Sequence, residues 1–113
     1  MQIINQEITI KELQAMAEKM FGNLVKAVVD IERNVMALDA ELHADEEALL
    51  LENGSEQKDL WGINLYPELK GDDFIEFDSM INLRPSQGNL TRGVANKEIQ
   101  EKIKAVVYKL IKP

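Results

Sequence analysis

The fold is decided by residues 24–42, which read LVKAVVDIERNVMALDAEL. Apolar side chains alternate through the first half of this segment, which is typical of a strand with one buried face. They are Val25, Ala27, Val29 and Ile31. A two-residue turn at Arg33 and Asn34 pairs Val29 with Leu38 and sorts apolar from polar side chains on both strands at once. The segment therefore predicts a β-hairpin in which Val29 and Leu38 are buried neighbours.

The same register predicts what lies on the second face of the hairpin. It sets Lys26 opposite Glu41, a favourable cross-strand pair. This face carries four acids in all, Asp30, Glu32, Asp39 and Glu41. We therefore expect Asp30 and Asp39 to be exposed to water.

Helices and further strands are predicted on either side of the hairpin. Thr9 and Glu12 have the spacing of a capping box, and Asn96 is a good N-cap. The predicted helices cover residues 9–22, 44–53 and 96–110, and the further strands cover residues 3–4, 60–66 and 74–83. Together they predict a single α+β domain over residues 1–113. In it, about three helices pack on one face of an antiparallel sheet of about four strands, and the other face stays open and acidic.

Composition excludes several classes of protein. The chain carries 20 acidic and 13 basic residues, for a net charge of −7, and residues 28–80 hold fifteen of the acids against three basic residues. Such an acidic stretch repels nucleic acid. The absence of cysteine excludes disulfides and thiolate chemistry. No apolar run reaches the length of a membrane span, and no signal peptide begins the chain, so a cytoplasmic protein is expected.

The only histidine, His43, is the first candidate for chemistry. Oriented by Asp45, it could act as a general base, or both residues could bind a metal. The alternative is that His43 or Asp45 caps a helix whose first turn holds Glu46 and Glu47. One histidine among scattered acids is a weak metal signal, so no metal site is assigned.

Acid pairs on strands are the second candidate. Asp30 with Asp39, and Glu76 with Asp78, could each bind a hard cation. The same pairs are typical of a solvated sheet face, which is the reading we prefer.

The third candidate is a polar segment after the last predicted strand, which reads NLRPSQGN over residues 82–89 and TRG over residues 91–93. Arginine side chains suit carboxylate and phosphate groups. The predicted ligand-binding residues are Arg84, Ser86, Gln87, Asn89 and Arg92, joined by Trp61 and Asn64. The alternatives are a hydrogen-bonded turn for the loop and a core position for the tryptophan.

Four stretches of the chain resemble a small prokaryotic protein family of unknown function. They read ELHADEE at 41–47, NGS at 53–55, DLWGIN at 59–64 and SMINLRP at 79–85. The resemblance implies a free-standing single-domain protein of bacteria or archaea, and it implies no activity.

The sequence therefore favours a non-enzymatic module that binds a small ligand or a protein, with an anion-binding loop at Arg84. The alternative is a small enzyme, such as a metal-assisted hydrolase using His43 and Asp45. An anionic small molecule or a protein partner is expected, no cofactor is identified, and the open sheet predicts a homodimer.

Overall fold

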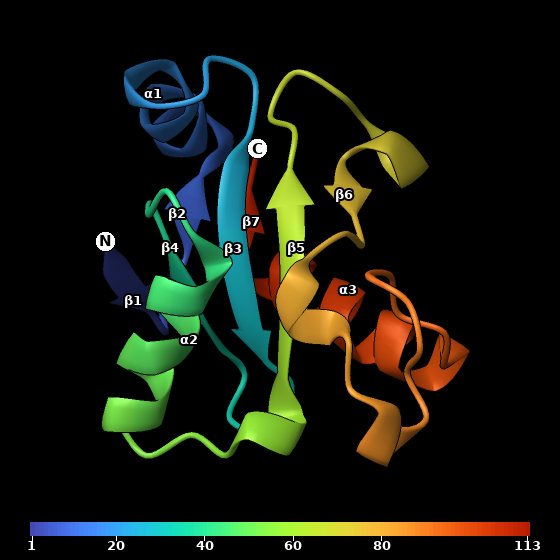
Figure 1. The fold of residues 1–113 in the computed structure, drawn as a ribbon. Helices are drawn as coiled ribbons and strands as arrows, with labels where there is room; N and C mark the ends of the chain where they lie inside the picture. The colour runs from blue at the N-terminus through green and yellow to red at the C-terminus, as the bar shows by residue number, and fades with distance from the viewer.

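The protein is built on a five-stranded antiparallel sheet with three helices around it (Figure 1). A computed structural model describes all 113 residues. The strand order across the sheet is β1 (Gln2–Ile4), β4 (Val35–Leu38), β3 (Val25–Asp30), β5 (Leu60–Leu65) and β6 (Ile75–Glu76). The helices are α1 (Ile10–Lys19), α2 (His43–Glu52) and α3 (Lys97–Leu110). Two short strands, β2 (Ile8–Thr9) and β7 (Ile111–Lys112), pair in parallel. The α+β class with an antiparallel sheet is confirmed.

Side-chain caps set the beginnings of two helices, as the sequence predicts. The Thr9 hydroxyl accepts the backbone N–H of Glu12 at 3.1 Å and starts α1. The Asn96 side chain accepts the backbone N–H of Ile99 at 3.1 Å and starts α3. These bonds satisfy N–H groups that have no partner within the helix.

The hairpin of β3 and β4 forms, but its register differs from the predicted one by two residues. Val29 pairs with Met36, and Leu38 pairs with Ala27. The turn holds four residues, 31–34, because the Asp30 carboxylate accepts the backbone N–H groups of Glu32 and Arg33 and fixes the conformation of the turn. A shift of two keeps every side chain on its predicted face. Val29 and Leu38 are therefore both buried, as predicted, without being direct partners.

The prediction that Asp30 is exposed is wrong. Asp30 is fully buried, and its second carboxylate oxygen accepts the Ser55 hydroxyl at 2.5 Å. Its first oxygen accepts the backbone N–H groups of Glu32 at 3.0 Å and of Arg33 at 2.9 Å. Three hydrogen bonds offset the cost of removing this carboxylate from water. Asp39 is half-buried rather than exposed.

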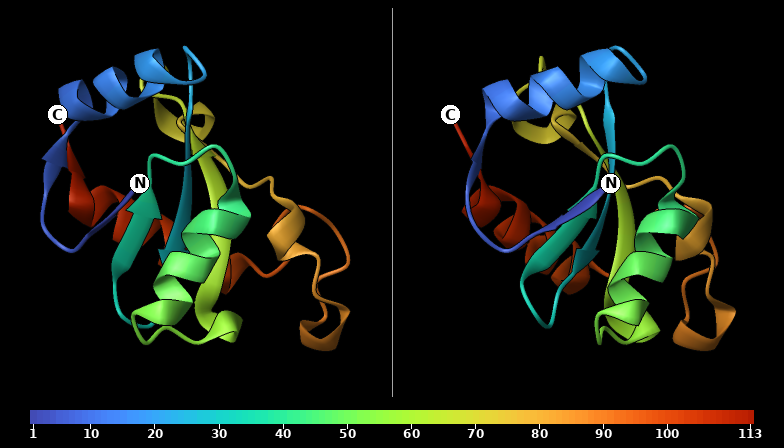
Figure 2. Two further views of the ribbon diagram at one scale, coloured as in Figure 1. Left: turned by 60° about the vertical axis from the view of Figure 1, so that its left-hand side comes forward. Right: turned by 90° about the vertical axis from the view of Figure 1, so that its left-hand side faces the viewer.

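Helices cover both faces of the sheet, so the predicted open acidic face does not exist. Figure 2 shows α2 on one side of the sheet and α1 with α3 on the other. The larger core lies on the side of α1 and α3, and a smaller one lies under α2. The smaller core is formed by Val28, Ala37, Leu50 and Leu60. Its sheet residues alternate with those of the larger core, so β3 and β5 are buried on both faces.

The long strand predicted over residues 74–83 is interrupted after β6. Ser79 caps a 3₁₀ turn, η3 (Met80–Asn82), by accepting the backbone N–H of Ile81 at 3.3 Å. Its own backbone N–H donates to the carbonyl of Arg92 at 2.9 Å. The alternating pattern here therefore reflects a folded loop that packs on β5.

A carboxyl group is buried beneath α2 without a charged partner. Glu46 is 0 % exposed, one of its oxygens accepts the Ala40 N–H at 3.1 Å, and the other has no partner. Burial raises the pKa of Glu46 to about 9, against the smaller opposing effect of the Ala40 bond. The side chain is therefore neutral near pH 7.

This neutral carboxyl makes stability depend on pH. Because the folded pKa lies above the unfolded one, the unfolded chain releases its Glu46 proton between about pH 4.5 and 9 while the folded chain keeps it. Glu46→Gln is expected to match the parent near pH 4 and to be more stable at pH 7, by up to about 3 kcal/mol. Urea unfolding of both proteins from pH 4 to 8 measures the difference. A difference that does not change with pH contradicts a neutral Glu46.

Candidate functional site

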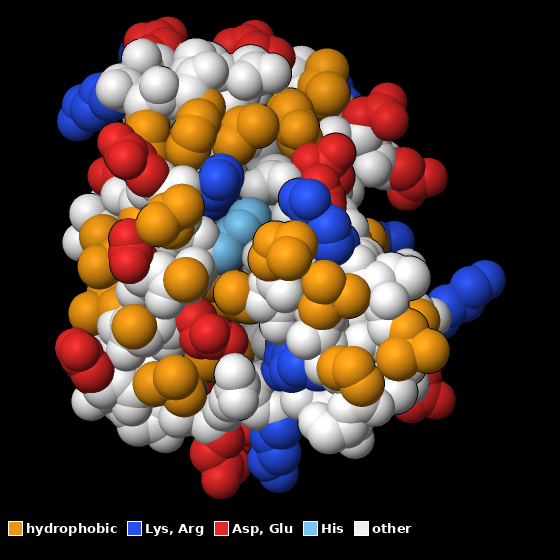
Figure 3. Space-filling view, viewed as in Figure 1, with side chains coloured by type: hydrophobic (Ala, Val, Ile, Leu, Met, Phe, Trp, Pro, Cys, Tyr) orange, Lys and Arg blue, Asp and Glu red, His pale blue; other side chains and the backbone are white.

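A hollow of about 220 Å³ opens on the face that carries α2, between the start of that helix and the loop after β6. Figure 3 shows the only histidine at its base, with basic side chains on either side. The lining residues are Lys26, Leu42, His43, Ala44, Asn64, Asp78, Ser79, Met80, Ile81 and Arg92. They come from β3, α2, β5 and the loop, which are far apart in sequence.

The wall formed by the loop depends on a glycine in β5. A Cβ atom at Gly62 would lie 2.5 Å from the Cβ atom of Ser79, so only glycine lets the loop lie this close. The Asn82 side chain then bonds both backbone groups of Gly62, accepting its N–H and donating to its carbonyl, each at 2.9 Å. One amide side chain thus replaces a strand neighbour at this position and anchors Ser79 and Arg92 beside β5.

His43 is the first residue of α2 and is held as a neutral imidazole. Its Nε2 atom donates to the Ile63 carbonyl at 2.7 Å, since a carbonyl only accepts. Burial lowers the pKa of His43, opposed by this bond; Lys26 and Arg92 lower it further and Asp78 opposes them. The Nδ1 atom therefore keeps a free lone pair at neutral pH.

Two cationic side chains face this hollow with donors to spare. The Nε atom of Arg92 lies 2.8 Å from a carboxylate oxygen of Asp78, and no other residue accepts a hydrogen bond from its guanidinium. Lys26 makes no ion pair, and its Nζ atom lies 5.0 Å from the centroid of the Phe21 ring. The hollow thus brings two cations together in a chain whose net charge is −7.

The start of α2 adds partial positive charge to the same place. The N-cap residue is Leu42, which has no side-chain group to accept the first helical N–H groups. Those of His43 and Ala44 have no partner inside the helix, and both residues line the hollow. The helix dipole favours an anion there.

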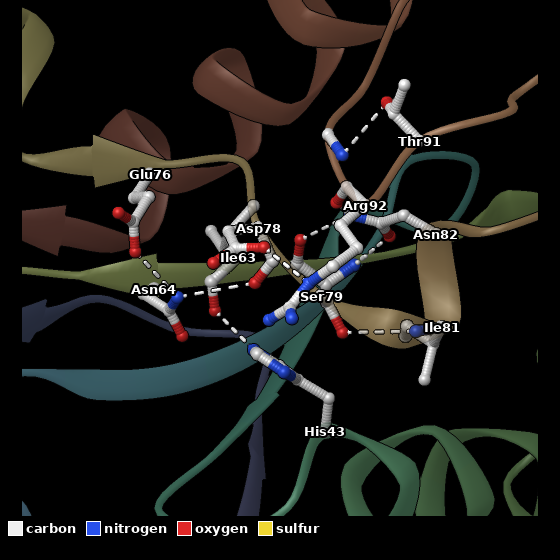
Figure 4. A network of polar contacts seen from close by, with 12 residues as sticks. His43, Ile63, Asn64, Glu76, Asp78, Ser79, Ile81, Asn82, Thr91 and Arg92 are labelled. Carbon is white, nitrogen blue, oxygen red and sulfur yellow. Dashed lines mark hydrogen bonds and ion pairs between the residues drawn. The ribbon is translucent and has the colours of Figure 1, made fainter.

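Asn64 contributes an acceptor to the hollow. The residue is 7 % exposed, and its Nδ2 atom donates to a Glu76 carboxylate oxygen at 2.8 Å and to the Asp78 carbonyl at 3.3 Å. Its Oδ1 atom is buried and has no hydrogen-bond partner. Figure 4 shows that oxygen turned away from Glu76, on the side of His43.

Arg84 lies elsewhere, and the structure gives it a structural role. It is 8 % exposed, and its guanidinium carbon lies 4.2 Å from the centroid of the Trp61 ring. The guanidinium donates to four oxygens: Ile81 O at 3.1 Å, Gln57 O at 2.5 Å, the Leu60 carbonyl and Gln87 Oε1 at 3.1 Å. Burial lowers the pKa of Arg84, while Glu47 has the opposite, smaller effect. Nearly all its donors are already used, which leaves little to offer an external anion.

The other residues predicted around Arg84 divide between structure and the hollow. Gln87 bonds Arg84 and also donates to the Lys58 carbonyl at 3.2 Å. Asn89 is buried and its amide closes the loop, with bonds of 2.7 Å to Asn82 O, 2.8 Å to Gly93 O and 2.9 Å from Ala95 N. Ser86 is exposed and Trp61 is buried in the core. Only Asn64 and Arg92 of that predicted set join His43 in the hollow.

The predicted partner of the histidine is not in the hollow. Asp45 is exposed and does not line the cavity that His43 lines. The predicted pair of Glu76 and Asp78 is also engaged, because Glu76 accepts from Asn64 and from the Tyr66 hydroxyl, and Asp78 binds Arg92. In the other predicted pair, Asp30 is engaged by Ser55 and by the loop after β3. No three histidine, aspartate or glutamate side chains cluster closely enough to hold a metal ion.

Sequence reasoning missed the basic wall of the hollow formed by Lys26. The ladder between β3 and β4 ends at Ala27 and Leu38, so Lys26 does not face Glu41, and on its other side it pairs with Asn64 of β5. The sequence did mark Lys26 as unusual, since it is the only cation in a strand whose other residues are apolar except for Asp30. That Lys26 has no acidic partner could be known only from the observed pairing of the strands.

Comparison with known proteins identifies the family. A family described as a protein of unknown function, DUF5674, matches residues 2–110. The chain belongs to this family. No curated protein and no solved structure matches the DUF5674 chain. None of its helices combines the length and apolar character needed to cross a bilayer.

Proposed function

We propose that this DUF5674 protein is a binding module for a small anion, which it takes into the hollow between Lys26, His43 and Arg92. The observation that carries the proposal is the convergence of two cations with free donors on an uncapped helix start, in a chain that is acidic overall. Carboxylate and phosphate groups are the natural partners of such a set of donors.

The dimensions of the hollow favour a compact ligand. Its volume of about 220 Å³ lies below the range of roughly 300–1,000 Å³ that is usual for drug-sized ligands. The polar groups around it are held by their own bonds, as for Arg92 on Asp78 and Asn64 on Glu76. Such preorganisation lowers the entropy lost on binding.

The proposed site still uses the predicted anion-binding loop, but a different arginine of that loop contacts the anion. Arg92, from the end of the loop, takes the role predicted for Arg84, whose donors are used internally. The enzyme alternative is less well supported, because Asp45 lies outside the hollow and the Nε2 atom of His43 is engaged. A cytoplasmic location, a prokaryotic source and a homodimer remain predictions.

Titration with acetate and with inorganic phosphate, followed by amide NMR shifts, tests the proposal. We expect saturable shifts at millimolar ligand in the residues that line the hollow. Loss of one charge-assisted hydrogen bond corresponds to roughly tenfold or more in affinity. Lys26→Gln and Arg92→Gln are therefore each expected to weaken binding about tenfold.

The matched control is Lys58→Gln, which removes an exposed cation whose only ion pair is a long contact of 3.9 Å to Glu56. It changes the net charge by the same amount and should leave affinity unchanged. Equal weakening by all three variants would mean that net charge alone attracts the anion. Shifts centred on Arg84 instead of Arg92, or none at all, would defeat the proposal.

A further inference from the structure

Building on the proposed function, we infer that the preferred ligand is a small α-hydroxy carboxylate, a carboxylate whose neighbouring carbon carries a hydrogen-bond donor. The geometry behind this is the pairing, in one hollow, of cationic donors with a buried acceptor that has no partner, the Oδ1 atom of Asn64. A plain anion such as acetate satisfies only the donors.

The free oxygen of Asn64 has no hydrogen-bond partner within the protein. Its Nδ2 atom is held by Glu76 Oε1 at 2.8 Å and by the Asp78 carbonyl at 3.3 Å. Turning the amide over would place Oδ1 against those two acceptors, which repel it. The acceptor therefore stays on the side of His43, away from Glu76, where leaving it without a donor is costly.

A ligand that supplies a donor recovers this cost, and one that lacks a donor does not. A site built to hydrogen-bond a hydroxyl group rejects the analogue without it, because the buried polar group of the protein is left unpaired. The hydroxyl must sit close to the carboxylate, since Asn64 and the cationic side chains Lys26 and Arg92 share a space of only about 220 Å³. A substituent on the adjacent carbon meets this requirement.

The charge of the hollow favours a hydroxyl over an ammonium group as that donor. Lys26 and Arg92 each carry a positive charge and Asp78 carries one negative charge, while His43 is neutral. The hollow therefore holds one net positive charge. An α-hydroxy carboxylate neutralises it, whereas an α-amino carboxylate has no net charge and places a cation beside two others.

Comparison of lactate, propionate and alanine tests the inference, with amide NMR titration of the intact protein as the readout. The three ligands are similar in size and differ only in the group on the carbon next to the carboxylate. We expect lactate to bind about tenfold more tightly than propionate, the ratio that one hydrogen bond of about 1.4 kcal/mol produces. Alanine is expected to bind more weakly than lactate.

Asn64→Leu removes the acceptor and is expected to bring lactate down to the affinity of propionate. If this variant does not fold, the ratio of lactate to propionate in the parent protein decides alone. Equal binding of lactate and propionate by the parent overturns this inference and leaves the proposed function standing. A preference for lactate that persists in Asn64→Leu, or tighter binding of alanine, also overturns it. No binding of any carboxylate or of phosphate defeats the proposed function as well.

Discussion

Replacing Arg84 with alanine is expected to lower the free energy of unfolding by about 3–5 kcal/mol, because several buried oxygens lose their charged donor at once. Three backbone carbonyls accept from this side chain, those of Gln57, Leu60 and Ile81. They belong to the turn η1 (Gln57–Asp59), to β5 and to the turn η3, so one guanidinium joins three segments. Urea unfolding followed by circular dichroism measures the loss.

Two further variants separate this structural role from a general effect of charge. Arg84→Lys keeps the charge but has no planar fork, so it is expected to recover only a small part of the stability. Arg33→Ala is the matched control, because Arg33 is exposed and makes one bond, of 2.7 Å to the Asn53 carbonyl. It should cost less than about 1 kcal/mol. If the Arg84→Ala protein is as stable as the parent, the bonds of Arg84 do not stabilise the fold and its guanidinium is available to bind an anion.

Truncation of Leu38 to alanine is expected to cost about 2–5 kcal/mol, the range for removing a large buried aliphatic side chain. Leu38 is 0 % exposed and lies in β4 between β1 and β3, opposite Gln2 and Ala27. Neighbours on both strands hold the backbone in place, so the cavity cannot collapse easily. Thermal and urea unfolding of the variant measure the cost.

Leu90→Ala provides the comparison for this truncation. The same atoms are removed, but Leu90 is 70 % exposed, so stability should change by no more than about 0.5 kcal/mol. Similar costs at the two positions would mean that β4 does not lie inside the sheet between β1 and β3.

The two arginines of the loop show how tertiary contacts assign roles to similar residues. Arg84 and Arg92 stand eight positions apart, and both looked suited to bind an anion. Arg84 is buried against Trp61 and its donors are used by carbonyls, whereas Arg92 is held by Asp78 alone and lines the hollow beside Lys26. The local sequence does not reveal this difference, because two of the three carbonyls that occupy Arg84 belong to Gln57 and Leu60, which lie 27 and 24 residues away.

The sequence by itself determined the local elements. Thr9 and Asn96 start helices because their side chains accept nearby N–H groups, and alternation identifies β3 and β5, since these signals depend on residues close together in the chain. Burial of Val29 and Leu38 was also predictable, because a register error of two residues keeps every side chain on its face.

Only the tertiary structure decided what covers the second face of the sheet and where the hollow lies. Asp30 looks exposed until Ser55, 25 residues away, donates to it. The hollow forms because Gly62 lets the loop approach β5 and because Asn82, 20 residues further along, bonds both backbone groups of that glycine. These contacts join segments whose spacing in sequence carries no periodic signal, so their energies enter only when the whole chain is folded.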